Sequence, residues 1–426
     1  MTVVEATRIA GGASGKAGGL LAVWAYPSNI VPLSFKLHQD LAIEHGGEET
    51  WGYRRVSCGN LEAVGRERSE LERLGAQAGV SLGKRVAEQE KLSRKSKSKD
   101  GLAGLPKDLD WVMPDLVKSY EKMGGSKETA QVHPYQFTIS MMRLAQERGV
   151  NLIIGSVTDI NYTESNAPPP PPPLPVTPPL GSGSHNPQPG GPPSPALSFT
   201  SASSYPASLS GRRRVTSITY TDLQTSKTHT LPATTAILAA GPWTSKLYPS
   251  APISGLRAHS VTITPASPVS AYALFTEITI PQSPSSSATD PPPPPVSPEI
   301  YARPNNEIYV CGEGDMDVAV PATTADVVVD ESRCDNLIAQ VSSISDHIRL
   351  GRVTRKQACY LPILSVGGSG GPLIGETGTG GLLMASGHSC WGINNAPATG
   401  MLLSEMVFEG KAVSADIRQL DPRRIL

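Results

Sequence analysis

Short apolar runs alternate with amphipathic helices near both ends of the chain, and this alternation constrains the fold more than any other feature. The runs predicted to form buried strands are Val3-Val4, Val150–Ile154, Ala236–Ala240 and Leu382–Ala385. Alternation of this kind is typical of parallel sheets, so the pattern predicts one parallel sheet built from distant segments. The middle, 253–352, is rich in Thr, Val and Tyr, which predicts a more antiparallel inserted domain.

Two helices can be placed from their start and stop signals. Pro134 suits the first turn of one helix and Gly149 suits its end. Its apolar face repeats at helical spacing through Phe137, Met141, Leu144 and Ala145. Pro397 is predicted in the first turn of the second helix, which Gly410 would end. The apolar face of that helix carries Leu402, Leu403, Met406 and Val407.

Glycine and proline are unusually frequent, with 41 and 40 residues in a chain of 426. Many lie in two segments, 164–210 and 281–298, which have few apolar residues and are predicted to be disordered or polyproline-like insertions. Such tracts also dock on partner proteins, although a solvated spacer is the simpler interpretation. The basic stretch 83–100 has no aromatic residues, which favours a solvated charged loop over a nuclear or nucleic-acid signal.

Charge and cysteine content exclude several classes of protein. Lys plus Arg (37) balances Asp plus Glu (38), so no overall field attracts nucleic acid. The five cysteines are scattered without metal-ligand spacing, which indicates a reducing compartment and no metal site. No apolar run reaches the roughly 18 residues of a membrane span, and Glu5 stands where a leader would be basic or apolar. We therefore expect a soluble, cytoplasmic protein.

Two glycine-containing loops, one near the start of the chain and one near its middle, follow predicted strands. Glu5 ends the first strand, and Ser14-Gly15-Lys16 follows in a loop of small residues. A carboxylate there could accept from two ribose hydroxyls while backbone N–H groups face phosphate, although an ordinary turn fits equally well. The second loop holds Gly241 and Trp243, where glycine permits close backbone approach to a ligand or simply makes a turn.

The third loop runs from Gly387 to Gly400 and delivers the N-terminus of the last long helix. It contains His388, Gly392 and Ile393. Free N–H groups and the positive end of the helix dipole would stabilise negative charge on a bound ring carbonyl. His388 alone also fits an ordinary loop or core histidine.

In this order, the loops resemble those of the D-amino-acid oxidase superfamily of FAD-dependent oxidoreductases, which includes glycine and sarcosine oxidases, and most closely a fungal branch of it. The strand end Ala239-Ala240-Gly241 and the turn Gly371–Gly375 are similar too. The resemblance implies an α/β fold: a discontinuous Rossmann-like FAD-binding domain with an inserted α+β substrate domain. The implied FAD-binding segments are 1–60, 130–255 and 355–426, and the substrate domain takes 61–129 and 256–354.

The same resemblance implies which residues contact FAD, including the backbone of Val157 at the adenine. These residues are Glu5, Ser14, Gly15, Lys16, Val157, Gly241, Trp243, Gly387, His388, Gly392 and Ile393. The implied function is FAD-dependent oxidation of a C–N bond in a small amine or amino-acid-like substrate. No residue is singled out as a general base, and Tyr360 and Trp391 are candidate pocket walls or core residues.

Two departures from the family pattern, and one cysteine that could match it, bear on this implied function. No G-x-G-x-x-G turn precedes Glu5, which predicts either a fragment lacking roughly 25–30 residues or a protein that does not hold FAD normally. Leu361 replaces the arginine that binds a substrate carboxylate, which argues against a simple amino acid. Cys359 stands about where the sarcosine oxidase branch links its flavin covalently, although a buried inert thiol is the simpler interpretation.

Two other functions remain open from the sequence. A non-catalytic adapter or trafficking protein could keep the fold without flavin and bind partners through its proline tracts. A nicotinamide-dependent dehydrogenase is also possible, but the loop at 387–400 disfavours it.

Overall fold

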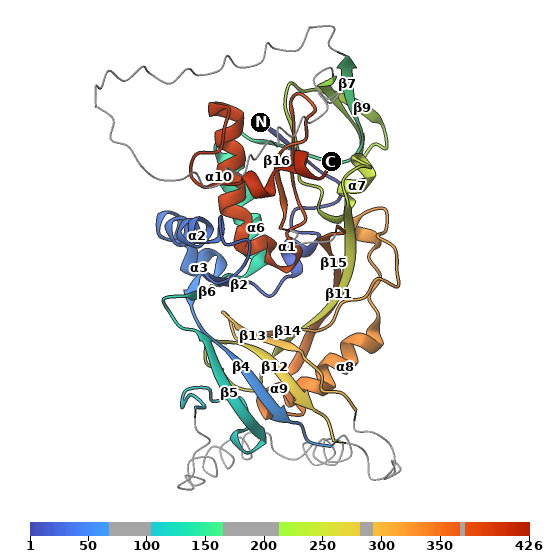
Figure 1. The fold of residues 1–426 in the computed structure, drawn as a ribbon. Helices are drawn as coiled ribbons and strands as arrows, with labels where there is room; N and C mark the ends of the chain where they lie inside the picture. Colours follow the sequence, from blue (N-terminus) through green and yellow to red (C-terminus); the bar gives the residue numbers. More distant parts are fainter. Residues whose placement is uncertain (68–103, 165–212, 282–292, 367–370) are drawn as a thin grey trace, which may run out of the picture.

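The computed structural model describes residues 1–67, 104–164, 213–281, 293–366 and 371–426. The predicted basic loop at 83–100 and nearly all of the first proline-rich segment lie outside the described residues. Figure 1 shows two parts: one carries most of the helices and the strands at both chain ends, and the other is a large sheet. The long strands β11 and β15 run from one part into the other (Figure 1).

Two parallel strand pairs join segments that are distant in sequence. The first pair belongs to a four-stranded sheet of order β1-β7-β8-β9 and the second to a three-stranded sheet of order β10-β17-β16. The first sheet comprises β1 (Thr2–Glu5), β7 (Asn151–Glu164), β8 (Arg213–Asp222) and β9 (Thr228–Pro232). The second comprises β10 (Ala236–Leu238), β16 (Leu373–Glu376) and β17 (Leu382–Ser386). Strands β1 and β7 pair in parallel, as do β10 and β17, so the predicted long-range pairing is confirmed.

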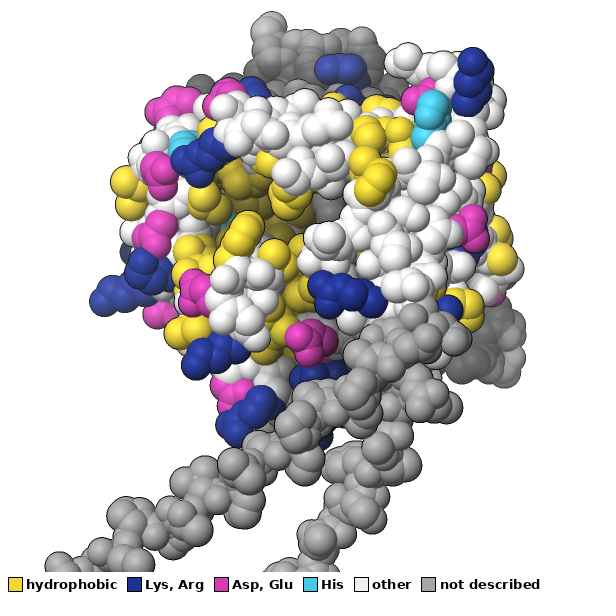
Figure 2. All heavy atoms as spheres, turned by 90° about the horizontal axis from the view of Figure 1, so that it is seen from above, with side chains coloured by type: hydrophobic (Ala, Val, Ile, Leu, Met, Phe, Trp, Pro, Cys, Tyr) yellow, Lys and Arg dark blue, Asp and Glu magenta, His cyan; other side chains and the backbone are white. Residues whose placement is uncertain are grey.

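The prediction of one parallel sheet is wrong for the described residues, because the two pairs lie in separate sheets. Among those residues, β1 pairs with β7 alone and β10 pairs with β17 alone, so each has one open edge. Ile237 in β10 is 42% exposed, although its sequence is that of a buried strand. Seen from above, the end of the molecule that carries these sheets is hollowed, and hydrophobic side chains line the hollow (Figure 2).

Helix α6 (Pro134–Glu147) confirms the first helix prediction, with Pro134 at its first position and Gly149 at φ +86° just past its end. Phe137 from its apolar face packs against the fully buried Trp51 of α3 (Gly47–Trp51). Helix α2 (Val31–His45) packs against α10 (Gly392–Glu409).

Helix α10 begins at Gly392, so the prediction that Pro397 lies in its first turn is wrong. Pro397 has no N–H group to donate to the carbonyl of Ile393 one turn earlier. His38 of α2 supplies the missing donor, because its Nε2 lies 2.9 Å from Ile393 O. The Ala398 N–H is likewise directed to Ser34 Oγ of α2, at 3.2 Å. Helix α2 therefore allows α10 to continue through the proline.

The large sheet has seven strands in the order β15-β11-β14-β13-β12-β4-β5, all antiparallel except the parallel pair β12 and β4. Its strands are β4 (Ser57–Val64), β5 (Val117–Gly124), β11 (Ile253–Thr264), β12 (Tyr272–Thr279), β13 (Glu299–Arg303), β14 (Glu307–Cys311) and β15 (Arg352–Leu364). Strands β4, β11 and β15 cross the domain limits predicted at 60, 255 and 355. One face packs on α8 (Glu331–Ser342) around buried Val261, Ile300 and Leu337.

The remaining elements are short. A three-stranded sheet of order β2-β6-β3 joins β2 (Leu20–Ala22), β6 (Thr129–Gln131) and β3 (Arg54–Arg55). The α-helices of the described residues that are not yet named are α1 (Ala13–Lys16), α7 (Thr244–Leu247) and α9 (Asp346–Arg349). No described helix is long and apolar enough to cross a membrane.

The second proline-rich segment, 281–298, is described at 281 and 293–298, and one of these residues pairs with the large sheet. Val296 and Ile278 exchange backbone hydrogen bonds of 2.8 and 2.9 Å, and Ile278 belongs to β12, which lies between β13 and β4 in the large sheet. Pairing with β12 gives these backbone groups the partners that an isolated spacer would lack.

Candidate functional site

The strand ends at Gly241 and Gly387 lie together, as the sequence predicts for parallel neighbours. Gly241 opens the 3-10 turn η3 (Gly241–Trp243), and its carbonyl accepts from Ser386 Oγ at 3.0 Å and from Thr244 Oγ1 at 2.7 Å. Its φ is +53°, and a Cβ added there would meet no atom within 4 Å. Gly241 therefore borders open space that a ligand could approach closely.

The loop after β17 places His388 beside this point. Gly387 takes φ +83°, and the 3-10 turn η5 (Ser389–Trp391), which contacts β15, follows His388. Burial lowers the pKa of His388 to about 4, so its ring is neutral at pH 7. Its Nδ1 is buried without a hydrogen-bond partner among the described residues. A buried ring nitrogen of this kind is available to a bound group.

Two asparagine side chains hold the start of α10 against the segment that contains β2 and Tyr26. Asn394 Oδ1 accepts from the Ala22 N–H of β2 at 2.9 Å, and Asn395 Nδ2 donates to Tyr26 O at 3.0 Å. Gly392 and the buried Ile393 open this 18-residue helix. First-turn N–H groups have no acceptor within a helix, so this end is suited to negative charge.

The loop after β1 makes hydrogen bonds and close contacts within itself, which the sequence did not predict. Glu5 is half-buried at the end of β1, and its Oε1 accepts from Thr7 N at 3.1 Å. Gly15 donates its N–H to Gly12 O at 3.1 Å, so this N–H has an acceptor within the loop itself. A Cβ on Gly15 would lie 2.0 Å from Ala10 O, so close packing within the loop requires glycine there.

Lys16 and Ser14 point in different directions. Lys16 Nζ donates to Ala358 O of β15 at 2.8 Å, and burial lowers the pKa of its ammonium. Ser14 is exposed, and its carbonyl accepts from Thr138 of α6 at 3.2 Å. The structure thus brings Lys16 to the large sheet, next to Cys359.

Val157 lies on β7 three residues beyond Ile154, the parallel partner of Glu5, so Glu5 and Val157 share one end of the four-stranded sheet. Val157 is half-buried beside a register shift between β7 and β8. Such bulges are common next to binding sites because they redirect a side chain.

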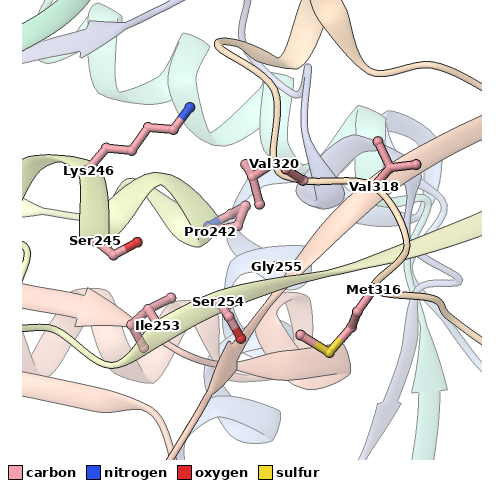
Figure 3. Close-up of a pocket in the computed structure, with 10 residues that line it drawn as sticks. Pro242, Ser245, Lys246, Ile253, Ser254, Gly255, Met316, Val318 and Val320 are labelled. Carbon is pink, nitrogen blue, oxygen red and sulfur yellow. The ribbon is translucent and has the colours of Figure 1, made fainter.

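Trp243 fixes a loop beside a separate cavity. Its Nε1 donates to Pro321 O at 2.7 Å, and Lys246 Nζ donates to the same carbonyl at 2.7 Å. Figure 3 shows the cavity of about 280 Å³ between this turn, β11 and the loop that carries Met316 and Val318.

Tyr360 lies on that same side of β15. Its hydroxyl donates to Val318 O at 3.2 Å and to Ala319 O at 3.1 Å. Because alternate residues of a strand face opposite ways, Tyr360 points away from Cys359. It therefore does not share a pocket with Cys359.

The face of the large sheet directed towards α1 carries functional groups that sequence reasoning missed. We call it the site face; it carries Phe275, Glu299, Tyr301, Tyr309, Cys311 and Cys359. Glu299 Oε2 accepts from the Tyr301 hydroxyl and lies 3.6 Å from Cys311 Sγ. Burial raises the pKa of the Glu299 carboxyl. No local pattern in the sequence marks this acid, because its neighbours across the sheet come from β12 and β14.

Cys359 and Leu361 continue the site face along β15. Burial raises the pKa of the Cys359 thiol to about 11, although the nearby Lys16 ammonium lowers it. Leu361 is half-buried opposite Leu256, so two leucines stand where a carboxylate-binding arginine would be expected.

These groups fit FAD at several points: the open space at Gly241, the unpartnered His388 Nδ1, the free first turn of α10 and the Glu5 carboxylate. Among the residues that the structure describes, no group of three or more His, Cys, Asp or Glu side chains could hold a metal ion.

Together, the parallel strand ends, the helix N-terminus and the large covering sheet define a flavin-dependent oxidoreductase of the α/β class. The chain belongs to the DAO family, described as FAD dependent oxidoreductase, which matches residues 1–167 and 202–406.

Two yeast proteins are similar over almost the whole chain. Putative oxidoreductase TDA3 of Saccharomyces cerevisiae is 37% identical, over 99% of this chain and 88% of that protein. Putative oxidoreductase C1F5.03c of Schizosaccharomyces pombe is 30% identical, over 99% and 90%.

Among solved structures, glycine oxidase from Geobacillus kaustophilus has a TM-score of 0.59 at 16% identity, covering 100% of this chain and 92% of that chain. Iminodiacetate oxidase from Chelativorans sp. BNC1 has a TM-score of 0.57 at 15% identity, covering 99% and 92%. At these identities the likeness shows the fold.

Proposed function

We propose that this protein binds FAD and oxidises a C–N bond of a small amine or amino-acid-like substrate. The observation that carries the proposal is the convergence of Gly241 and the loop at 387–392, joined through Ser386 and covered by β15. The names of glycine oxidase and iminodiacetate oxidase, both for C–N substrates, support the reaction class.

In this proposal, Glu5 holds the ribose and the Val157 backbone contacts the adenine, while Gly241 and the start of α10 border the flavin ring. FAD, when bound, supplies the acceptor for a hydride that leaves the substrate carbon. The nitrogen loses a proton, which leaves an imine that water can hydrolyse. The first turn of α10 stabilises the negative charge that accompanies this transfer.

The test begins with full-length purified protein reconstituted with FAD. We expect visible flavin absorbance, its bleaching when an amine is added without oxygen, and its recovery in air. A colourless but folded protein that does not take up FAD would overturn the proposal in favour of an adapter that keeps the fold.

A matched pair of serine variants tests the position of the site. S386A removes the hydroxyl that holds Gly241 O, and we expect FAD affinity to fall about tenfold, as for loss of one buried hydrogen bond. S365A removes a hydroxyl that pairs with Ser254 on the surface, and we expect no change. Equal FAD affinity in both variants would place the flavin elsewhere.

A further inference from the structure

We infer that Glu299 and the aromatic rings beside it form a subsite for a substituted ammonium group, so that the substrate is an amine cation without an α-carboxylate. This inference rests on the proposed oxidation and names the substrate class for the same site.

Strand register places Glu299 between two site-face neighbours. Phe275 of β12 lies directly opposite it on one side, and Cys311 of β14 lies opposite it on the other. Opposite residues of antiparallel strands have Cβ atoms about 5 Å apart on one face. Glu299 therefore stands within a continuous row across the sheet, at the start of β13.

The carboxylate of Glu299 lacks a positive partner. Its two donors among the described residues, Tyr301 and Cys311, both reach Oε2, which leaves Oε1 for a ligand. None of the ion pairs that the structure describes includes Glu299, whereas carboxylates such as Asp315 and Asp346 on this domain pair with arginines. A half-buried acid without a cation is complementary to a cationic ligand.

Aromatic rings lie beside this carboxylate. The Trp24 ring is 6.2 Å from Phe275 and 5.6 Å from Trp391, with interplanar angles of 65° and 89°. Trp24 is 36% exposed, so the group opens to solvent. Near-perpendicular rings present their faces in different directions, an arrangement suited to cation–π contact with an alkylated ammonium.

The subsite adjoins the loop proposed to border the flavin. Trp391 belongs to that loop, and the charge of Glu299 contributes to raising the pKa of the neighbouring Cys390 thiol, behind burial as the larger cause. A substrate nitrogen at Glu299 would thus lie between the sheet and the loop at 387–392.

The cationic side chains near the site face are not available to bind a substrate carboxylate. Lys16 donates to Ala358 O, and Arg303 donates to Ala17 O, to Gly18 O and to Glu307. Arg355 is exposed six residues before Leu361, about 20 Å along the strand at 3.3 Å per residue. With Leu361 in the expected arginine position, the site favours an amine over an amino acid.

The first experiment uses tetramethylammonium as a probe and follows the tryptophan fluorescence of the full-length protein, with and without FAD. We expect saturable binding that E299Q weakens at least about tenfold. F275L keeps the acid and should weaken binding a few-fold, in the range of one cation–π contact. E277Q removes an exposed acid two residues beyond Phe275 and should bind as the unchanged protein does.

Equal binding by E299Q, F275L and the unchanged protein would overturn the inference. If E299Q does not fold, as judged by its thermal midpoint, F275L decides the outcome alone. This binding assay needs no turnover, so it can succeed even where the proposed oxidation fails.

The second experiment compares butylamine with 2-aminopentanoate, which differs by a carboxylate, as reductants of the flavin under anaerobic conditions. We expect the amine to have the lower KM, by about tenfold or more. Lower KM for the amino acid would overturn the inference while leaving C–N oxidation intact. Reduction by neither compound, together with binding of tetramethylammonium, would count against the proposed function and for the subsite.

Discussion

The proline inside α10 gives a prediction whose size follows from the structure. His38 is completely buried, and its Nε2 donates to Ile393 O, the carbonyl that Pro397 leaves without a donor. H38L replaces the ring with a side chain of similar volume that cannot donate. An unsatisfied buried carbonyl costs about 1–3 kcal/mol, so H38L should lower the free energy of unfolding by about 2 kcal/mol.

A double-mutant cycle isolates the cause. P397A restores an N–H that can reach Ile393 O, so H38L should cost less than about 1 kcal/mol in that background, giving a coupling energy of about 1–2 kcal/mol. The assay is urea unfolding at pH 7, followed by tryptophan fluorescence with the slopes compared between variants. H45L, in the last turn of the same helix, is the control and should change stability little. An equal cost of H38L in both backgrounds would refute the assignment of His38 as the replacement donor.

Three further predictions concern pH, specificity and the flavin link. Burial lowers the pKa values of His38 and His388 to about 4, below the ordinary 6.5, so the unfolded chain binds protons first as pH falls. The free energy of unfolding should therefore be highest above pH 6.5 and should fall as the pH is lowered towards 4. Between pH 6.5 and 5, the fall in the free energy of unfolding should be about 2 kcal/mol smaller in H38L than in the unchanged protein, as measured by urea unfolding at each pH. L361R should lower the KM for amino acids about tenfold by adding a carboxylate partner, measured by flavin reduction; an unchanged KM would contradict this placement. Because burial raises the pKa of Cys359 to about 11, we expect FAD to be released by acid precipitation both with Cys359 and in C359S; flavin retained only in the former would establish a covalent link.

Local patterns were sufficient where the determinants of structure are themselves local. Helix α6 follows from a proline at its start, a periodic apolar face and Gly149 at its end, all within 16 residues of sequence. The start of α10 could not be predicted in the same way. The donor that allows helix to precede Pro397 comes from His38, which is 355 residues away in sequence from the carbonyl of Ile393.

The same distinction holds for the site face. Gly387 could be found because it follows a recognisable strand and takes φ +83°, a conformation that favours glycine. Glu299 could not be found, because its meaning depends on its register with Phe275 and Cys311, which only strand pairing establishes. Within its own strand it is one acid among alternating polar and apolar residues.

Two glycines show why a sequence motif alone does not identify a ligand contact. Gly15 and Gly241 both follow short strands and both suggested close approach of the backbone to a cofactor. A Cβ on Gly15 would strike Ala10 O at 2.0 Å, whereas a Cβ on Gly241 would meet nothing within 4 Å. The first glycine is therefore required by the packing of its own loop, and the second borders space that the protein leaves open. Since the same residue type answers both demands, separating them requires knowing what surrounds each Cα.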